Sequence, residues 1–182
     1  MKKYILLIFL TFLNTQASAT IKNKIIKVLL EVNNITFDFE QNVGGTIENG
    51  TCTIKYPKKI FCKYDLRNQK ILVSDGKSLV IKTNSSYYLY PLEKTPLYLI
   101  LNKEFILNKI SNLNERVIEN KFINFRFKEN NNEINIFFDI KTYNLVGWQT
   151  LDIYQNLSIT YLSAIRKNQN LNDNIFVIPS RN

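Results

Sequence analysis

The chain contains no histidine, and this absence excludes more functions than any other feature of its composition. Without an imidazole, the serine–histidine and cysteine–histidine nucleophile systems cannot form. Glycine is also scarce, with five in 182 residues, and neither a phosphate-binding loop nor a dinucleotide-binding pattern is present. Asp139 and Asp152 lie in late strand-like segments without a paired carboxylate, so we assign them to turns and strand ends. We therefore expect a protein that is not an enzyme and has no catalytic residues.

A long apolar run is present only at the N-terminus. The segment "MKKYILLIFLTFLNTQASA" has a basic start, an apolar run from Tyr4 to Leu13 and a small-residue ending at Ala19, which is typical of a secretory signal peptide. The alternative, a membrane anchor, would need about 20 apolar residues. We therefore predict a cleaved signal peptide at 1–19 and a single domain at 20–182.

Charge of one sign is in excess, but it forms no block. The formal net charge is +9, and removal of the leader leaves 22 basic against 15 acidic residues. The basic side chains are scattered along strands as the solvent-facing half of an alternating pattern. An exported chain with this distribution is not expected to bind nucleic acid. The charge would suit docking to acidic partners, although ordinary solvation explains it equally well.

Cysteine occurs only twice, in the hairpin "GTCTIKYPKKIFCKY". If this hairpin turns at Pro57, residues whose numbers sum to 114 face each other, so Cys52 opposes Cys62 and Ile54 opposes Ile60. Disulfides persist in exported proteins. A zinc site would need four ligands, and no histidine is available. We therefore predict a structural Cys52–Cys62 disulfide and no metal site.

The hydrophobic periodicity predicts a mainly β protein with a few α-helices. A helical stripe covers residues 21–32, and alternation with period two begins at Ile35. "ILVSDGKSLVI" reads as a hairpin with Asp75 and Gly76 at its turn, and Thr95 is expected to cap a helix that starts at Pro96. Further strands follow residue 122. This order indicates one strongly curved antiparallel sheet with its helices on one face.

The segment "PLYLIL" (96–101) is apolar on every side of a short helix. Such a helix is either an ordinary core helix or a cover over an apolar surface that is exposed at times. Periodicity alone does not separate these two interpretations.

Several motifs occur in a fixed order: "FDFEQ" after the first helix, Gly50 opening the hairpin at Pro57, "LVSDGKSL", "KTPLYLIL", and "F-x-x-P" from Phe176 to Pro179. Together they resemble the periplasmic outer-membrane lipoprotein carrier family of Gram-negative bacteria. The resemblance covers essentially the whole of the chain after the leader.

This resemblance implies an incomplete half β-barrel whose helices form a lid over a concave hydrophobic face. It implies a standing hollow that takes up the acyl chains of lipoproteins in the periplasm. An ATP-driven (ABC) inner-membrane transporter would load the carrier, and an outer-membrane acceptor would receive its cargo. We expect a monomer without cofactor.

The resemblance also assigns ligand contacts to Leu29, Ile60 and Ile100. Alternation and the resemblance together give the full predicted ligand-binding set: Leu29, Phe39, Ile54, Tyr56, Ile60, Val73, Leu97, Ile100 and Leu101. Both faces of the 71–81 hairpin are apolar, so alternation leaves open whether Ile71 and Val73 or Leu72 and Leu79 face the hollow.

One position departs from the family pattern. Many members carry an arginine immediately before the hairpin proline, where it holds the lid helices shut through hydrogen bonds; here the residue is Tyr56. A tyrosine hydroxyl can bond a lid carbonyl, but it offers one donor where arginine offers five.

Two alternative functions stay open. One is a regulator that senses a lipid or lipoprotein on the same fold. The other is an exported structural or adhesive β-domain with a fully packed core, which the all-round apolar "PLYLIL" segment argues against.

Overall fold

A computed structural model describes residues 20–129, 132–152 and 155–181. The predicted signal peptide at 1–19 lies outside the described residues. Three α-helices are present in the described part of the chain: α1 (Ile21–Glu31), α2 (Leu97–Leu101) and α3 (Lys103–Asn112). Two 3-10 helices accompany them: η1 (Leu92–Lys94) and η2 (Asp173–Phe176). No helix within these ranges is long and apolar enough to cross a membrane.

The strands of the described chain form one antiparallel sheet. They are β1 (Asn34–Val43), β2 (Thr46–Lys55), β3 (Lys59–Tyr64), β4 (Ile71–Asp75), β5 (Ser78–Lys82), β6 (Tyr87–Pro91), β7 (Arg116–Ile118), β8 (Phe122–Glu129), β9 (Asn132–Asp139), β10 (Leu145–Leu151) and β11 (Leu157–Lys167). Their order is β6-β5-β4-β3-β2-β1-β11-β10-β9-β8-β7. The sheet is curved and is not closed into a barrel, so the predicted fold class is confirmed.

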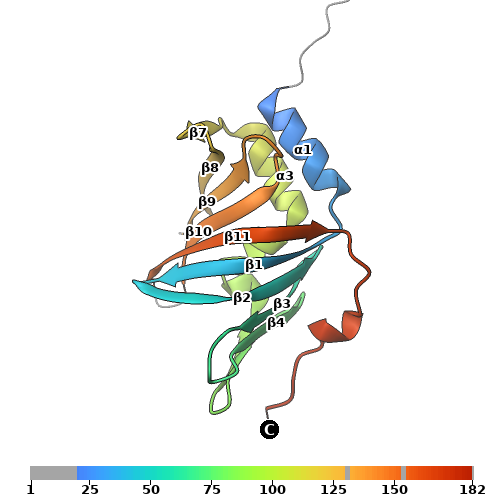
Figure 1. The fold of residues 1–182 in the computed structure, drawn as a ribbon, viewed down its shortest axis with the longest axis vertical. Coiled ribbons are helices and arrows are strands. Elements are labelled where there is room, and N and C mark those ends of the chain that lie inside the picture. Colours follow the sequence, from blue (N-terminus) through green and yellow to red (C-terminus); the bar gives the residue numbers. More distant parts are fainter. Residues whose placement is uncertain (1–19, 130–131, 153–154, 182) are drawn as a thin grey trace, which may run out of the picture.

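The helices pack against one face of this sheet, which we call the concave face. In Figure 1, α3 crosses behind β10, β11 and β1, and α1 lies beside it. We refer to α1, α2 and α3 together as the lid. The buried face of α1 carries Ile25 and Leu29, while Thr20 caps its first turn by accepting a hydrogen bond from the Asn23 backbone N–H. The helix predicted at 21–32 is therefore confirmed to within one residue.

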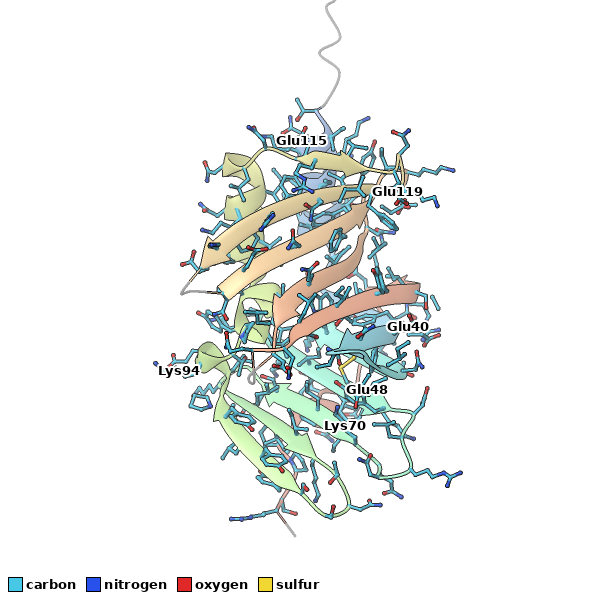
Figure 2. The ribbon with its side chains drawn as sticks, turned by 90° about the vertical axis from the view of Figure 1, so that its left-hand side faces the viewer. Glu40, Glu48, Lys70, Lys94, Glu115 and Glu119 are labelled. Atoms are coloured by element: carbon cyan, nitrogen blue, oxygen red, sulfur yellow. A yellow bond between two sulfur atoms is a disulfide. The ribbon has the colours of Figure 1, made fainter. Side chains whose placement is uncertain are left out.

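The β2–β3 hairpin has the register that the sequence predicts. Cys52 pairs with Cys62 and Ile54 with Ile60. The two cysteines form a disulfide with a Cα–Cα distance of 4.1 Å, which appears as the yellow bond near the labelled Glu48 in Figure 2. Alternation had assigned both cysteines and both isoleucines to one face, and all four are buried in the core on the concave side.

Two local predictions were wrong in detail. The strands β4 and β5 leave Gly76 and Lys77, rather than Asp75 and Gly76, as the turn, and Gly76 takes a φ of +102°. Asp75 instead supports the turn, because its carboxylate accepts hydrogen bonds from the backbone N–H groups of Lys77 and Ser78. In addition, the hydroxyl of Thr95 donates backwards to the Leu92 carbonyl and does not cap α2.

The assignment of the late aspartates to turns is confirmed. The Asp139 carboxylate accepts a hydrogen bond from the Thr142 backbone N–H at 2.6 Å, which lowers the pKa of Asp139. The Asp152 carboxylate accepts one from the Asn156 backbone N–H at 2.8 Å.

Candidate functional site

The interior between the concave face and the lid is the candidate site. Its walls are aromatic and aliphatic side chains from both halves of the sheet, including Phe37, Ile54, Ile60, Phe125 and Trp148. Leu99, Ile100 and Leu101 of α2 and Ile106 and Ile110 of α3 cover them. The α2 residues that are not buried, Leu97 and Tyr98, are half-buried against the same core, which explains why the helix has no polar face.

Most of the predicted ligand-binding residues lie in this interior. Leu29, Phe39, Ile54, Ile60, Ile100 and Leu101 belong to its buried core, and Tyr56 and Leu97 pack against that core as half-buried side chains. Whether they contact a ligand stays a prediction.

The prediction that Val73 lines the interior is wrong. It pairs with Phe61 and Val80, whereas Leu72 pairs with Cys62. Leu72 and Leu79 contact the core beneath the lid, so Val73 faces the opposite, outer side of the sheet.

The C-terminal segment covers that outer side. Lys59 lies over the ring of Phe176 at 5.9 Å, and Lys55 forms an ion pair with Asp173 at 2.6 Å. Figure 1 shows this segment running beside β3 and β4. The outer face of the hairpin is therefore apolar because a distant segment packs on it.

Across the described residues, side chains of the concave face and the lid pack in one buried core where the resemblance implies a standing hollow. Beneath α1, a cavity of about 10 Å³ lies among Leu29, Val32, Ile35 and Tyr56, which is room for about one water molecule. A wider depression lies on the outside of α1, along Ile26 and Leu30, so it does not lie between helix and sheet. The lid is closed in this conformation, so the expected acyl chain could enter only after the lid moved.

Two hydrogen bonds fix the lid helices: one joins α2 to the β2–β3 turn, and the other joins α3 to the segment between α1 and β1. The backbone N–H of Lys58 donates to the Leu101 carbonyl of α2 at 3.0 Å. The Lys103 ammonium of α3 donates to the Val32 carbonyl at the end of α1 at 2.9 Å. We call these two bonds, with the residues that make them, the latch.

Two further bonds support the latch. The backbone N–H of Tyr56 donates to the Asn33 carbonyl at 2.9 Å, directly after α1. At the other end of the lid, the Lys22 ammonium donates to the Leu113 carbonyl at 3.0 Å. No sequence signal pointed to Lys22 or Lys103, because their acceptors are backbone carbonyls on segments distant in the chain.

The Tyr56 hydroxyl does not take the role of the family arginine. It is buried and has no hydrogen-bond partner among the described residues, whereas the expectation was a bond to a lid carbonyl. Burial raises the pKa of Tyr56 above its ordinary value, so the hydroxyl stays neutral. Backbone N–H groups and lysines make the lid contacts instead.

A polar network occupies the opposite end of the same hairpin. The Tyr64 hydroxyl donates to the Gln41 side-chain carbonyl at 3.4 Å, and Lys70 lies over the Tyr64 ring at 4.2 Å while pairing with Glu48 at 2.6 Å. Glu48 and Lys70 are both labelled in Figure 2. Burial, and then the Glu48 charge, raise the pKa of Tyr64. Gln41 in turn donates to Ser158.

The charged groups of the described residues offer no metal site. In residues 20–129, 132–152 and 155–181, no three His, Cys, Asp or Glu side chains gather as a metal ion would require. The geometry instead provides an apolar interior under a hydrogen-bonded cover, which suits the burial of an apolar ligand.

Solved structures are similar to this chain at low sequence identity, and the first of those below shares its fold. An uncharacterized conserved protein from Thermus thermophilus aligns with a TM-score of 0.52 and 7% identity, over 88% of this chain and 93% of that one. A LolA superfamily protein from Nitrosomonas europaea aligns with a TM-score of 0.43 and 8% identity, over 88% and 99%. The Mycobacterium tuberculosis lipoprotein LppX aligns with a TM-score of 0.44 and 9% identity, over 84% of this chain and 96% of that one.

Sequence comparison gives a sharper result. No curated protein sequence matches the chain significantly. A sequence profile of one family, described as "Outer membrane lipoprotein carrier protein LolA", matches residues 31–179. This match spans the sheet, α2, α3 and the segment up to Pro179. The chain therefore belongs to the outer membrane lipoprotein carrier protein (LolA) family.

Proposed function

We propose that this protein is a periplasmic, non-catalytic carrier that holds the acyl chains of lipoproteins and delivers them to an acceptor at the outer membrane. The observation that carries the proposal is an apolar interior closed by a lid that few hydrogen bonds hold in place. Membership of the LolA family supports the same role. The proposed periplasmic location relies on the leader-like sequence at 1–19.

Loading begins when the latch opens. The bond from Lys58 to Leu101 then breaks, so that α2 can leave the β2–β3 turn, and the bond from Lys103 to Val32 breaks, so that α3 can separate from the end of α1. Each net hydrogen bond contributes only about 1 kcal/mol, so most of the closure comes from the apolar side chains that the lid buries, and an acyl chain must replace those contacts. Ile54, Ile60 and their neighbours on the concave face then become available to an acyl chain.

The energetics make an external source of work necessary. Burial of each methylene contributes about 0.8 kcal/mol, so removal of one acyl chain from a membrane costs on the order of 10 kcal/mol. The carrier offers comparable apolar burial, and an ATP-driven inner-membrane transporter supplies the work of extraction.

Unloading follows from a difference in affinity between two lid positions. A ligand shifts a conformational equilibrium only by its differential affinity for the two states. The closed core is already packed with the protein's own side chains, so the return of the lid favours release of the chain. An acceptor at the outer membrane that binds the loaded, open form completes the transfer, with the carrier acting as a monomer.

Depletion of the protein in its native cells tests this proposal. We expect lipoproteins to accumulate at the inner membrane, measured by membrane fractionation and immunoblotting. Complementation with the wild-type gene should restore sorting. Unchanged sorting would contradict the carrier role; if the purified protein still bound acyl probes, a lipid-sensing role would replace it.

A further inference from the structure

Within the part of the chain that the structure describes, the Tyr56 hydroxyl is a buried donor without a partner. Tyr56 lines the cavity of about 10 Å³ beneath α1, together with Val28, Leu29, Val32, Ile35, Leu145 and Ile165 and the polar side chains of Asn144 and Lys167. Burial of a hydroxyl without a hydrogen bond is unfavourable. We therefore expect the Tyr56 hydroxyl to have a hydrogen-bond partner in another state of the protein.

The neighbouring polar groups do not supply this partner. Lys167 donates to the Asn144 side-chain carbonyl at 3.1 Å. Lys103 lies over the ring of Tyr56, 5.7 Å from its centre, and its ammonium is bonded to the Val32 carbonyl. A single water would fit the cavity by volume, but a buried water needs two to four polar partners, and the lining is mostly apolar.

The backbone around Tyr56 fixes where its hydroxyl lies. The Tyr56 N–H is bonded to the Asn33 carbonyl, and two residues later Lys58 is bonded to Leu101 of α2. Tyr56 therefore stands at the junction of β2, the end of α1 and the latch, where a ligand meets the interior once the lid moves.

We propose that the Tyr56 hydroxyl donates a hydrogen bond to the ester carbonyl of a bound acyl chain and so fixes the depth at which the chain lies. This inference rests on the proposed carrier function and adds a polar contact to it. The ligand class is an ester-linked acyl chain, the chemistry that lipoprotein anchors share with phospholipids.

A neutral carbonyl suits this position better than a carboxylate. Burial of an ionised group costs far more than burial of a carbonyl that accepts a hydrogen bond. Because burial raises the pKa of Tyr56, its hydroxyl keeps its proton at neutral pH and can donate.

Matched ligands test the inference on the wild-type protein. We would measure the affinity of a diacylated lipopeptide with ester-linked chains and of an analogue with ether-linked chains of equal length, by fluorescence displacement. Only the ester offers the carbonyl acceptor. We expect the ester to bind about fivefold more tightly, the ratio that one ordinary hydrogen bond provides.

The variants Tyr56→Phe and Tyr64→Phe assign the preference to one residue. Tyr56→Phe should bind ester and ether equally. Tyr64→Phe is the matched control and should keep the preference, because the Tyr64 hydroxyl is already bonded to Gln41. If Tyr56→Phe does not fold, the comparison of ester and ether on the wild type still decides whether a carbonyl is recognised.

Further ligands separate the two sources of the ester. A phospholipid pair, ester and ether, that shows the same preference would support recognition of the ester itself; a preference with the lipopeptide alone would assign lipoproteins as its source. A fatty acid of the same chain length should bind more weakly than the ester at neutral pH. Tighter binding of the fatty acid would overturn the choice of a neutral carbonyl.

The outcomes distinguish this inference from the proposed function. If the wild type binds neither lipopeptide, the carrier role itself fails. If the wild type binds both equally, or if Tyr56→Phe keeps the ester preference, this inference fails while the carrier role stands.

Discussion

Tyr56 and Tyr64 occupy the two ends of one hairpin, and they differ in one respect. Both hydroxyls are buried, and burial raises the pKa of both. The Tyr64 hydroxyl donates to Gln41 and its ring lies under Lys70, whereas no described residue is a hydrogen-bond partner of the Tyr56 hydroxyl. At one end of the interior the polar side chains thus form a hydrogen-bonded network. At the end beside the latch, the Tyr56 hydroxyl is an unpaired hydrogen-bond donor.

Neighbouring elements explain this difference. The partners of Tyr64 come from β1, β2 and the segment before β4, which belong to or adjoin the sheet. Close packing also fixes that end, because a side chain at Gly50 would meet the Phe39 ring at 2.9 Å, and Phe39 contacts the Tyr64 ring edge-on. The surroundings of Tyr56 include the lid. A part that moves cannot serve as a permanent partner, which fits an interior that opens at one end.

The largest expected effect separates the two regions by their dynamics. Leu101→Ala, under the latch, and Leu79→Ala, on β5, each remove a buried leucine and should each cost about 3 kcal/mol of unfolding free energy. Native-state hydrogen exchange should then accelerate in α1 and α3 for Leu101→Ala, and in β4–β6 for Leu79→Ala. Identical exchange patterns would remove the distinction between a movable lid and a fixed sheet.

The next effect tests the latch directly. Lys103→Met removes the bond to the Val32 carbonyl and should lower the unfolding free energy by about 1 kcal/mol. It should also raise the rate of acyl-probe uptake about fivefold, measured by stopped-flow fluorescence.

Lys27→Met is the matched control on the lid. Lys27 is exposed on the outer side of α1, beside the depression along Ile26 and Leu30, and takes no part in the latch bonds. Its uptake rate should equal that of the wild type. Equal rates for all three proteins would show that the latch does not limit opening.

A third effect concerns the tyrosines themselves. Tyr64→Phe removes a satisfied hydroxyl and should lower the unfolding free energy by about 1 kcal/mol, measured by urea denaturation. Tyr56→Phe removes an unsatisfied one and should leave the stability unchanged or raise it by a few tenths of a kcal/mol. A larger loss for Tyr56→Phe would mean that its hydroxyl has a partner in solution.

The smallest effect is a pH dependence that both residues share. The folded state keeps protons on Tyr56 and Tyr64 that the unfolded chain releases near pH 10. The unfolded state then binds fewer protons, so the unfolding free energy falls as the pH rises through this value, by about 0.4 kcal/mol per tyrosine at pH 10. In each Tyr→Phe variant, the unfolding free energy measured by denaturation should fall less steeply between pH 8 and pH 10 than in the wild type. An unaltered dependence on pH would contradict the burial of that hydroxyl.

Local patterns predicted much of this molecule. The alternation around Pro57 fixed the β2–β3 register and the disulfide, because only one pairing places Cys52 opposite Cys62 with Ile54 opposite Ile60. The stripe at 21–32 predicted α1, because its buried face repeats every three to four residues.

The corrections involve contacts between distant segments. Val73 was assigned to the interior because its hairpin is apolar on both faces, and the second apolar face exists to pack against a segment about 100 residues later. The partners of the lid could not be foreseen, because backbone carbonyls carry no side-chain signal. The closed interior is likewise a result of packing, which alternation does not report.

The central claim is that the space between the concave face and the lid receives acyl chains, and photo-cross-linking tests it most directly. A diacylated lipopeptide with a photoreactive group near the end of one chain would be bound to the wild-type protein, irradiated and mapped by mass spectrometry. The account predicts adducts on residues of the interior such as Ile54, Ile60 and Ile100. Adducts confined to the outer face, around Val73 and the exposed Val177, would contradict it.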